Sequence, residues 1–196
     1  MTREGDRLSF TRSEGGLATG LGSLQIPYEK HWIGWPGICT DDPQERKTIG
    51  SELRRMHFHP VFLSEAEIEN YYEGYSTIWP LCHYFYAYTL YKSRFWEAYR
   101  EVNRRFCEEI CRVVEPGDRV WVQDYHLMLL PGMLREAMPD LCIGYFHHIP
   151  FPSYELFRIL PERARLLRGL LGADFIAFHT PDYMRHFVSA AQHILN

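Results

Sequence analysis

The sequence predicts an α/β protein with a Rossmann-like parallel sheet and helices on both faces. Three observations support this fold class. Short apolar runs of strand length alternate with segments of helical periodicity. Between residues 120 and 146, a strand, a helix and a second strand follow one another as a βαβ unit. Internal repeats and low-complexity tracts are absent from the sequence, so this pattern of elements carries the organisation.

The first elements are short and separated by turns. Residues 15–22 form a glycine-rich turn, and residues 31–37 read as a strand that closes in a turn. Residues 57–63 alternate in polarity like a second strand. Ser64, with Glu67 three positions later, forms a capping box that predicts the start of a helix.

The later elements follow the alternating pattern. Residues 91–114 place apolar side chains on one helical face, and Pro116 with Gly117 ends that helix. Strands are predicted at 120–123, 141–146 and 175–178, and helices at 127–137 and 166–171. The last helix begins with an N-cap, an N1 proline and an acid in the first turn, which are Thr180, Pro181 and Asp182.

Composition excludes several classes of protein. The 196 residues suffice for one domain or for one lobe of a larger enzyme, and 46% apolar with 23% charged residues is ordinary for a globular protein. A net charge of −4 argues against a nucleic-acid or anionic-membrane surface. The polar first twenty residues predict neither signal peptide nor membrane span. Five cysteines without a CxxC pair fit a reducing cytoplasm.

Two polar clusters fall where parallel sheets bind ligands, at the carboxyl ends of the strands. Asp124 follows the strand that ends at Gln123, and His148 follows the next strand, so both are expected at one edge. A carboxylate accepts from adjacent sugar hydroxyls, and an imidazole binds a hydroxyl without a fixed charge. The alternative is that Asp124 caps the following helix and His148 is a core histidine. The spacing of the residues does not distinguish this structural interpretation from the ligand-binding one.

Other candidates carry weaker signals. The glycine-rich turn matches neither GxGxxG nor a P-loop, so a plain tight turn is its default interpretation, and the alternative is a loop whose N–H groups approach a diphosphate. Residues 70–80 gather three tyrosines and a tryptophan beside a loop, either for a sugar phosphate or as core filling. Cys107 and Cys111 are spaced to share a metal on a helix, but buried small hydrophobes explain them better, so no metal is assigned.

Five motifs occur together in a fixed order over essentially the whole chain. They are Glu14-Gly15-Gly16-Leu17, Gly34-Trp35, the run from Tyr71 to Ser76 with Ile78-Trp79-Pro80, Gln123-Asp124-Tyr125-His126-Leu127, and His147-His148-Ile149-Pro150-Phe151-Pro152. This ordered set resembles that of the trehalose-6-phosphate synthases.

The resemblance implies the N-terminal domain of a GT-B glycosyltransferase across residues 1–196, with the family's first strand and its C-terminal donor domain absent. The implied substrates are UDP-glucose and glucose 6-phosphate, and the implied chemistry requires no cofactor or metal. Apart from the resemblance, the chain is expected to form a homo-oligomer and to lie in the cytoplasm. By matching positions, the implied donor-binding residues are Gly15, Gly16 and His148, the acceptor-binding residues Tyr72, Asp124 and Trp35, and the catalytic residues Asp124, His148 and Trp79.

The resemblance also implies glucosyl transfer with retention of configuration by front-face attack. Asp124 is then expected to orient the acceptor rather than to act as a covalent nucleophile. Because the family's phosphate-gripping arginine and diphosphate-binding residues lie outside this sequence, the isolated chain is expected to be inactive. The alternatives are a glucosylglycerol-phosphate synthase, a non-catalytic sugar-phosphate-binding regulatory homologue, and an α/β interaction module whose motifs only fill the core.

Overall fold

The computed structural model describes residues 2–4, 7–9, 20, 22–23, 25, 27–77 and 92–196. The chain divides into two compact units, Met1–Ser64 and Glu65–Asn196. Each unit has its own strands and helices, so the two are described separately.

The first unit contains two small sheets and one helix. Strands β1 (Thr2–Glu4) and β2 (Arg7–Ser9) pair antiparallel. Strands β3 (Trp32–Gly34) and β4 (Phe58–Pro60) pair parallel, with α2 (Pro43–Arg54) between them in the chain. The strands predicted within 31–37 and 57–63 are therefore confirmed, although both are shorter than expected.

Helix α2 was not among the predicted elements, yet its start carries a sequence signal. The Asp42 side chain accepts a hydrogen bond of 3.0 Å from the backbone N–H of Gln44, and Pro43 is the first helical residue. An aspartate N-cap followed by an N1 proline is a strong helix start. Ile49 and Leu53 on α2 pack into the buried core of this unit.

The second unit opens with helices that were only partly predicted. Helix α3 (Glu65–Glu67) continues into the π-helix η1 (Ile68–Tyr75), so most of the segment 70–80 expected beside a loop is helical. Helix α5 (Ser93–Val113) confirms the long predicted helix. It packs against η1, with the Tyr75 and Tyr99 ring centroids 4.5 Å apart.

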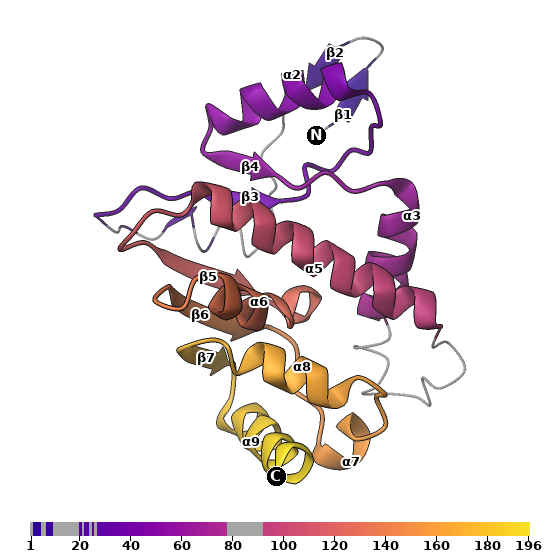
Figure 1. The fold of residues 1–196 in the computed structure, drawn as a ribbon, viewed down its shortest axis with the longest axis vertical. Coiled ribbons are helices and arrows are strands. Elements are labelled where there is room, and N and C mark those ends of the chain that lie inside the picture. The colour runs from indigo at the N-terminus through magenta and orange to yellow at the C-terminus, as the bar shows by residue number, and fades with distance from the viewer. Residues whose placement is uncertain are drawn as a thin grey trace. The chain divides into compact units, whose positions relative to one another are not determined.

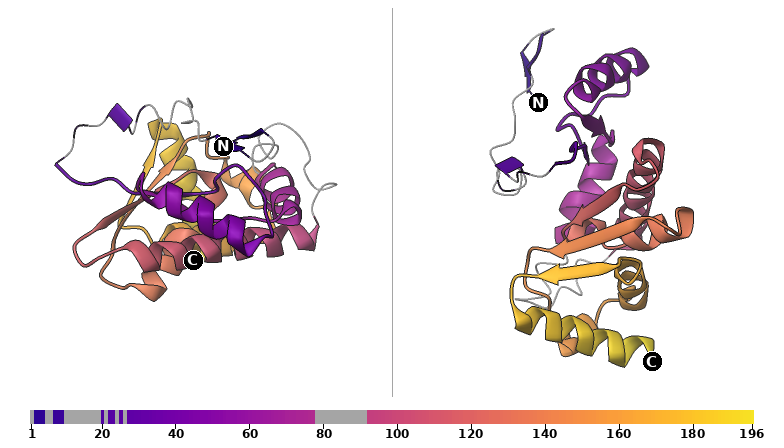
Figure 2. Two further views of the ribbon diagram at one scale, coloured as in Figure 1. Left: turned by 90° about the horizontal axis from the view of Figure 1, so that it is seen from above. Right: turned by 90° about the vertical axis from the view of Figure 1, so that its left-hand side faces the viewer.

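The second unit is built around a parallel sheet of order β5-β6-β7, which confirms the predicted α/β fold. The strands are β5 (Arg119–Gln123), β6 (Cys142–His147) and β7 (Phe175–Phe178), and their arrows point the same way in the right-hand view of Figure 2. The connections contain η3 (Tyr125–Leu127), α6 (Leu130–Ala137), α7 (Tyr154–Phe157) and α8 (Arg163–Leu170), and α9 (Pro181–Leu195) ends the chain (Figure 1).

Two helix boundaries differ from the prediction. The helix expected at 127–137 begins only at Leu130, because the residues after β5 first form the tight turn η3. Helix α8 starts at Arg163 rather than at residue 166. The start of α9 is confirmed: the Thr180 side chain accepts from the N–H of Tyr183, and Pro181 is the first helical residue.

The sheet has one buried face and one more exposed face. Val122, Ile143 and Tyr145 are buried, and α6 contacts β6. On the other face, Trp121 is 53% exposed and Phe175 is 69% exposed. Both pair in register with Gly144 of β6, which lies between them. The alternation follows from the two-residue side-chain period of a strand.

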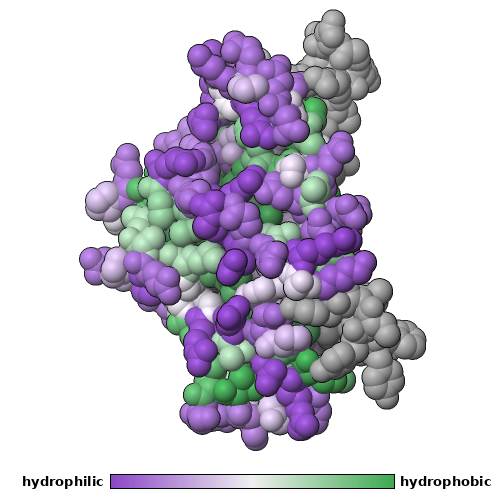
Figure 3. Space-filling model, turned by 45° about the vertical axis from the view of Figure 1, so that its right-hand side comes forward, coloured by the Kyte–Doolittle hydropathy of each residue, from purple (hydrophilic) through white to green (hydrophobic). Residues whose placement is uncertain are grey.

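Hydrophobic residues also reach the surface of the second unit where α7 and α9 lie (Figure 3). Large exposed hydrophobic residues in and beside these helices include Leu156, Ile159, Met184 and Val188. Among the described residues, none of the helices combines the length and hydropathy that crossing a membrane requires.

Candidate functional site

Asp124 lies directly after β5 in a strained backbone conformation. Its φ is 66° and its ψ is 172°, a region that is essentially restricted to glycine and costs of the order of 1–3 kcal/mol. Its backbone N–H donates to the carbonyl of Phe146 at 2.8 Å, and its Oδ1 accepts from the backbone N–H of His148 at 3.1 Å. The side chain makes no capping bond to the following turn. The helix-cap interpretation of Asp124 is therefore wrong.

His148 is brought to Asp124 by the parallel pairing of β5 with β6, as predicted. Gln123 pairs with Phe146 in register, so the residues after both strands meet at the carboxyl edge. The His148 Nε2 lies 2.9 Å from the Oε1 of Gln123, and its ring lies 5.6 Å from that of His179. Burial lowers the pKa of His148, the Asp124 carboxylate partly opposes this, and His179 lowers it further. The neutral form of the imidazole is therefore favoured over the charged form.

The turn after Asp124 is held by polar side chains from neighbouring helices. The Tyr99 hydroxyl donates to the carbonyl of Tyr125 at 2.7 Å and accepts from the N–H of Met128 at 3.0 Å. The carbonyl of His126 accepts from Asn103 Nδ2 and from the Tyr71 hydroxyl, both at 3.1 Å. This scaffold was missed at the level of the sequence, because only the apolar face of residues 91–114 was considered. The signal that was missed is Asn103, a buried polar residue within that helix.

Tyr72 reaches the same edge through His126. The two rings stack with centroids 5.2 Å apart and planes 10° apart, and Tyr72 is 55% exposed. Burial lowers the pKa of His126, which the Asp124 carboxylate partly opposes. Burial, with Asp124 and Tyr72 nearby, raises the pKa of Tyr125 to about 12. The edge therefore combines the Asp124 carboxyl group with imidazole and phenol rings, and burial favours the neutral forms of His126 and His148.

The remaining predicted residues lie in the first unit or outside the described residues, so the structure does not test their place at this edge. Trp35 belongs to the first unit, is 39% exposed, and donates its indole N–H to the carbonyl of Ile38 at 3.3 Å. Gly15, Gly16 and Trp79 lie outside the described residues. The structure thus brings together Asp124, His148 and Tyr72, and adds Gln123, which the prediction missed.

The arrangement suits a ligand rich in hydroxyl groups. A carboxylate accepts from two hydroxyls, a neutral imidazole donates or accepts once, and exposed phenols supply both a donor and a flat apolar face. A polar site at the carboxyl edge of a parallel sheet with helical crossovers defines the class of Rossmann-like α/β proteins that bind small polar ligands at that edge.

Within that class, the chain belongs to glycosyltransferase family 20, whose profile matches residues 2–196. It is 43% identical over 197 residues to an alpha,alpha-trehalose-phosphate synthase (UDP-forming) of Pichia angusta, covering 96% of this chain and 41% of that protein.

Solved structures show the same fold. The N-terminal domain of a Candida albicans trehalose-6-phosphate phosphatase matches with a TM-score of 0.81 and 33% identity, over 96% of this chain and 41% of that one. A Burkholderia xenovorans alpha,alpha-trehalose-phosphate synthase (UDP-forming) in complex with glucose 6-phosphate matches with a TM-score of 0.75 and 27% identity, over 93% and 40%. The chain thus spans about two fifths of the proteins it matches.

Proposed function

We propose that this chain forms the acceptor-binding part of a retaining glucosyltransferase that makes α,α-trehalose 6-phosphate and UDP from UDP-glucose and glucose 6-phosphate. The observation that carries the proposal is the cluster of Asp124, His148 and Tyr72 at one edge of the sheet, in a chain of family 20. The name of the Pichia relative and the glucose 6-phosphate complex of the Burkholderia structure support the choice of substrates.

Each residue of the cluster has a role that its chemistry permits. Asp124 accepts hydrogen bonds from acceptor hydroxyls, and the exposed Tyr72 phenol donates to the phosphate. His148, held neutral, binds a hydroxyl of the donor glucose without placing a second charge beside Asp124. Gly15 and Gly16 approach the donor diphosphate, and Trp35 and Trp79 wall the sugar pocket in the same proposal.

Asp124 orients the acceptor and forms no covalent bond to the sugar. Its Oδ1 already accepts from the backbone of His148 and its backbone is fixed by the carbonyl of Phe146, so the carboxylate is held rather than free to advance. Positioning of this kind accelerates a bimolecular transfer by lowering its entropic cost. The transfer requires no metal or cofactor in this proposal.

A second function has a specific observation in its favour. The Candida structure that matches with a TM-score of 0.81 is the N-terminal domain of a phosphatase, so this fold also occurs in a protein named for a different reaction. The competing proposal is a domain that binds a sugar phosphate without transferring glucose.

The test combines binding with turnover. Calorimetry measures glucose 6-phosphate binding to the chain and to Asp124→Asn, with Asp140→Asn as the control, because Asp140 is an exposed aspartate that precedes β6 at the opposite edge. UDP release from UDP-glucose is measured with glucose 6-phosphate or glycerol 3-phosphate, in the chain and in a longer protein that contains it.

Each result has a defined meaning. Release that requires glucose 6-phosphate supports the synthase, and release that requires glycerol 3-phosphate identifies a glucosylglycerol-phosphate synthase instead. Binding without release in the longer protein supports the non-catalytic domain. Equal binding by Asp124→Asn and Asp140→Asn would refute the site.

We also propose a cytoplasmic location and a homo-oligomeric state. In the part of the chain that the structure describes, Cys107, Cys111 and Cys142 are thiols without a disulfide, which suits a reducing compartment. The exposed rings of Trp121 and Phe175 provide apolar surface for association. Sedimentation of the purified chain tests the second proposal, and a monomer at every concentration would contradict it.

A further inference from the structure

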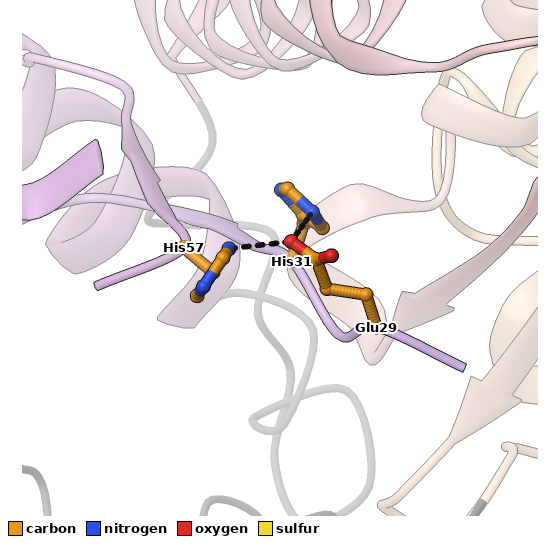
Figure 4. Close-up of side chains that lie close together, drawn as sticks. All are labelled: Glu29, His31 and His57. Atoms are coloured by element: carbon orange, nitrogen blue, oxygen red, sulfur yellow. Dashed lines mark hydrogen bonds and ion pairs between the residues drawn. The ribbon is translucent and has the colours of Figure 1, made fainter. Parts of the chain in front are cut away.

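The first unit carries a second cluster of polar side chains, formed by Glu29, His31 and His57 (Figure 4). The Glu29 Oε1 lies 3.0 Å from His31 Nε2 and 2.8 Å from His57 Nδ1. The three ligand atoms all lie within 4.8 Å of one another. In the part of the chain that the structure describes, this is the one such group of three histidine, cysteine or acidic residues.

Strand pairing brings these residues together. Trp32 of β3 pairs with Phe58 of β4, and the N–H of Trp32 donates to the carbonyl of His57 at 2.8 Å. His31 and His57 each precede one member of that pair, so they lie side by side at the amino ends of the two strands. Glu29 precedes His31 by two residues, and its carboxylate reaches both rings.

His57 adopts a backbone conformation that histidine seldom takes. Its φ is 58°, and its N–H donates to the carbonyl of Arg54 just after α2. Helix ends of this kind favour glycine or asparagine, because a side chain in the left-handed region costs free energy. In this conformation, the imidazole of His57 lies directly against the Glu29 carboxylate (Figure 4).

His31 has a partner on its other ring nitrogen. Its Nδ1 lies 2.9 Å from His59 Nε2, and the two rings stack with centroids 5.1 Å apart. Metal-binding histidines commonly donate the N–H of the second nitrogen to such an acceptor, which fixes the tautomer. With the proton of His31 on Nδ1, its Nε2 presents a lone pair toward Glu29.

We propose that Glu29, His31 and His57 form a binding site for a divalent transition-metal ion of the zinc class, with the remaining position open to solvent. Two imidazoles and one carboxylate match the ligands that zinc takes at about 2.0–2.2 Å, which places ligand atoms of a tetrahedron about 3.4 Å apart. The side chains of Glu29, His31 and His57 are 65%, 37% and 52% exposed, so they have room to move. Small rotations bring their ligand atoms from the observed distances to those of a tetrahedral site. Magnesium and calcium prefer all-oxygen sites.

This site is independent of the proposed glucosyl transfer and departs from the sequence-based prediction that the chain holds no metal. A metal ion here links the segment before β3 to the turn before β4. It therefore stabilises the first unit through binding to the folded state.

The experiment titrates Zn²⁺ into the tag-free chain by calorimetry in a weakly chelating buffer, with Mg²⁺ as the comparison. The variants are His57→Asn, which keeps a residue that tolerates the left-handed conformation, and His31→Gln. The control is His193→Gln, which removes an exposed histidine on α9. Substitution with Co²⁺ reports the ligands, because cysteine sulfur adds a charge-transfer absorption that nitrogen and oxygen ligands lack.

We expect one Zn²⁺ per chain, no heat of binding with Mg²⁺, and at least a tenfold loss of Zn²⁺ affinity in His57→Asn and His31→Gln but not in His193→Gln. Circular dichroism shows whether each variant is folded. Absence of Zn²⁺ binding, equal affinity in all variants, or a Co²⁺ spectrum with the sulfur band would each overturn the proposal, because the cluster would then be an ion-paired group without a metal.

Discussion

Asp124 combines a strained backbone with two hydrogen bonds that hold it in place. The N–H of Asp124 donates to Phe146, and its carboxylate accepts from the N–H of His148. Strain that persists at a polar sheet edge is typical of binding and catalytic positions. The residue therefore has a structural bond and a proposed ligand contact, and a substitution can separate the two.

Asp124→Asn is expected to change the free energy of unfolding by less than about 1 kcal/mol, because the amide oxygen still accepts from the N–H of His148. Glucose 6-phosphate affinity is expected to fall at least about tenfold, because a charged acceptor becomes neutral. Urea unfolding and calorimetry measure the two quantities. Unchanged affinity with unchanged stability would contradict the proposed role.

Protonation of His126 is expected to destabilise the fold. Burial lowers its folded pKa below the unfolded value of about 6.5. Between these two pKa values the unfolded state binds more protons than the folded state. The stability that neutral His126 contributes is therefore fully present above the unfolded pKa and is lost as pH falls through this window. Urea unfolding between pH 7.5 and pH 5 should show a smaller decrease in His126→Gln than in the original chain or in His193→Gln.

Helix α5 holds the turn after β5 by buried polar groups as well as by apolar packing. The Tyr99 hydroxyl bonds the backbone of Tyr125 and of Met128, and Asn103 bonds that of His126. These bonds satisfy backbone groups that would otherwise be buried without partners. The position of Asp124 thus depends on a helix that precedes it in the chain.

Tyr99→Phe is expected to lower the free energy of unfolding by about 1–3 kcal/mol, because the buried N–H of Met128 and the half-buried carbonyl of Tyr125 lose their partner. Tyr183→Phe on α9 is the matched control, and its effect is expected to stay within about 0.5 kcal/mol. Equal effects of the two substitutions on unfolding by urea would show that the Tyr99 hydroxyl contributes nothing.

Helices α6 and α8 approach closely because of their glycines. A Cβ on Gly169 would lie 2.5 Å from the carbonyl oxygen of Met128 and 2.8 Å from the Cα of Leu129. These neighbours are backbone atoms, so the clash cannot be relieved by a side-chain rotation. The close packing brings α8 against Met128 and Leu129, which follow the turn after Asp124.

Gly169→Ala is therefore expected to destabilise the chain by about 1–3 kcal/mol. Gly20→Ala is the control, since a Cβ at Gly20 meets nothing within 4 Å. Thermal unfolding followed by circular dichroism compares the two variants. Similar melting temperatures would mean that the helices separate at little cost.

Across the whole molecule, the metal-binding cluster and the three residues that carry the candidate sugar site lie in different compact units. The metal-binding cluster lies in Met1–Ser64, and Asp124, His148 and Tyr72 lie in Glu65–Asn196. Removal of metal by EDTA is expected to lower the melting temperature of the Zn²⁺-loaded chain and to leave its glucose 6-phosphate affinity within about twofold. Scanning calorimetry measures the melting temperature, and titration calorimetry measures the affinity for glucose 6-phosphate. A loss of that affinity in EDTA would contradict the prediction and show that the two sites are coupled.

Local sequence patterns predict the parallel α/β fold, the long helix, the start of α9 and the meeting of Asp124 with His148. Strand alternation, helical periodicity and capping have the same structural consequences in most proteins, so these features follow without tertiary information. Tertiary contacts are needed to show that Asp124 accepts from the N–H of His148 instead of capping the next turn. Tertiary contacts also show that Tyr99 and Asn103 support that turn and that Glu29 meets His31 and His57. These contacts join segments far apart in the chain or depend on unusual backbone angles, and local patterns carry no information about either.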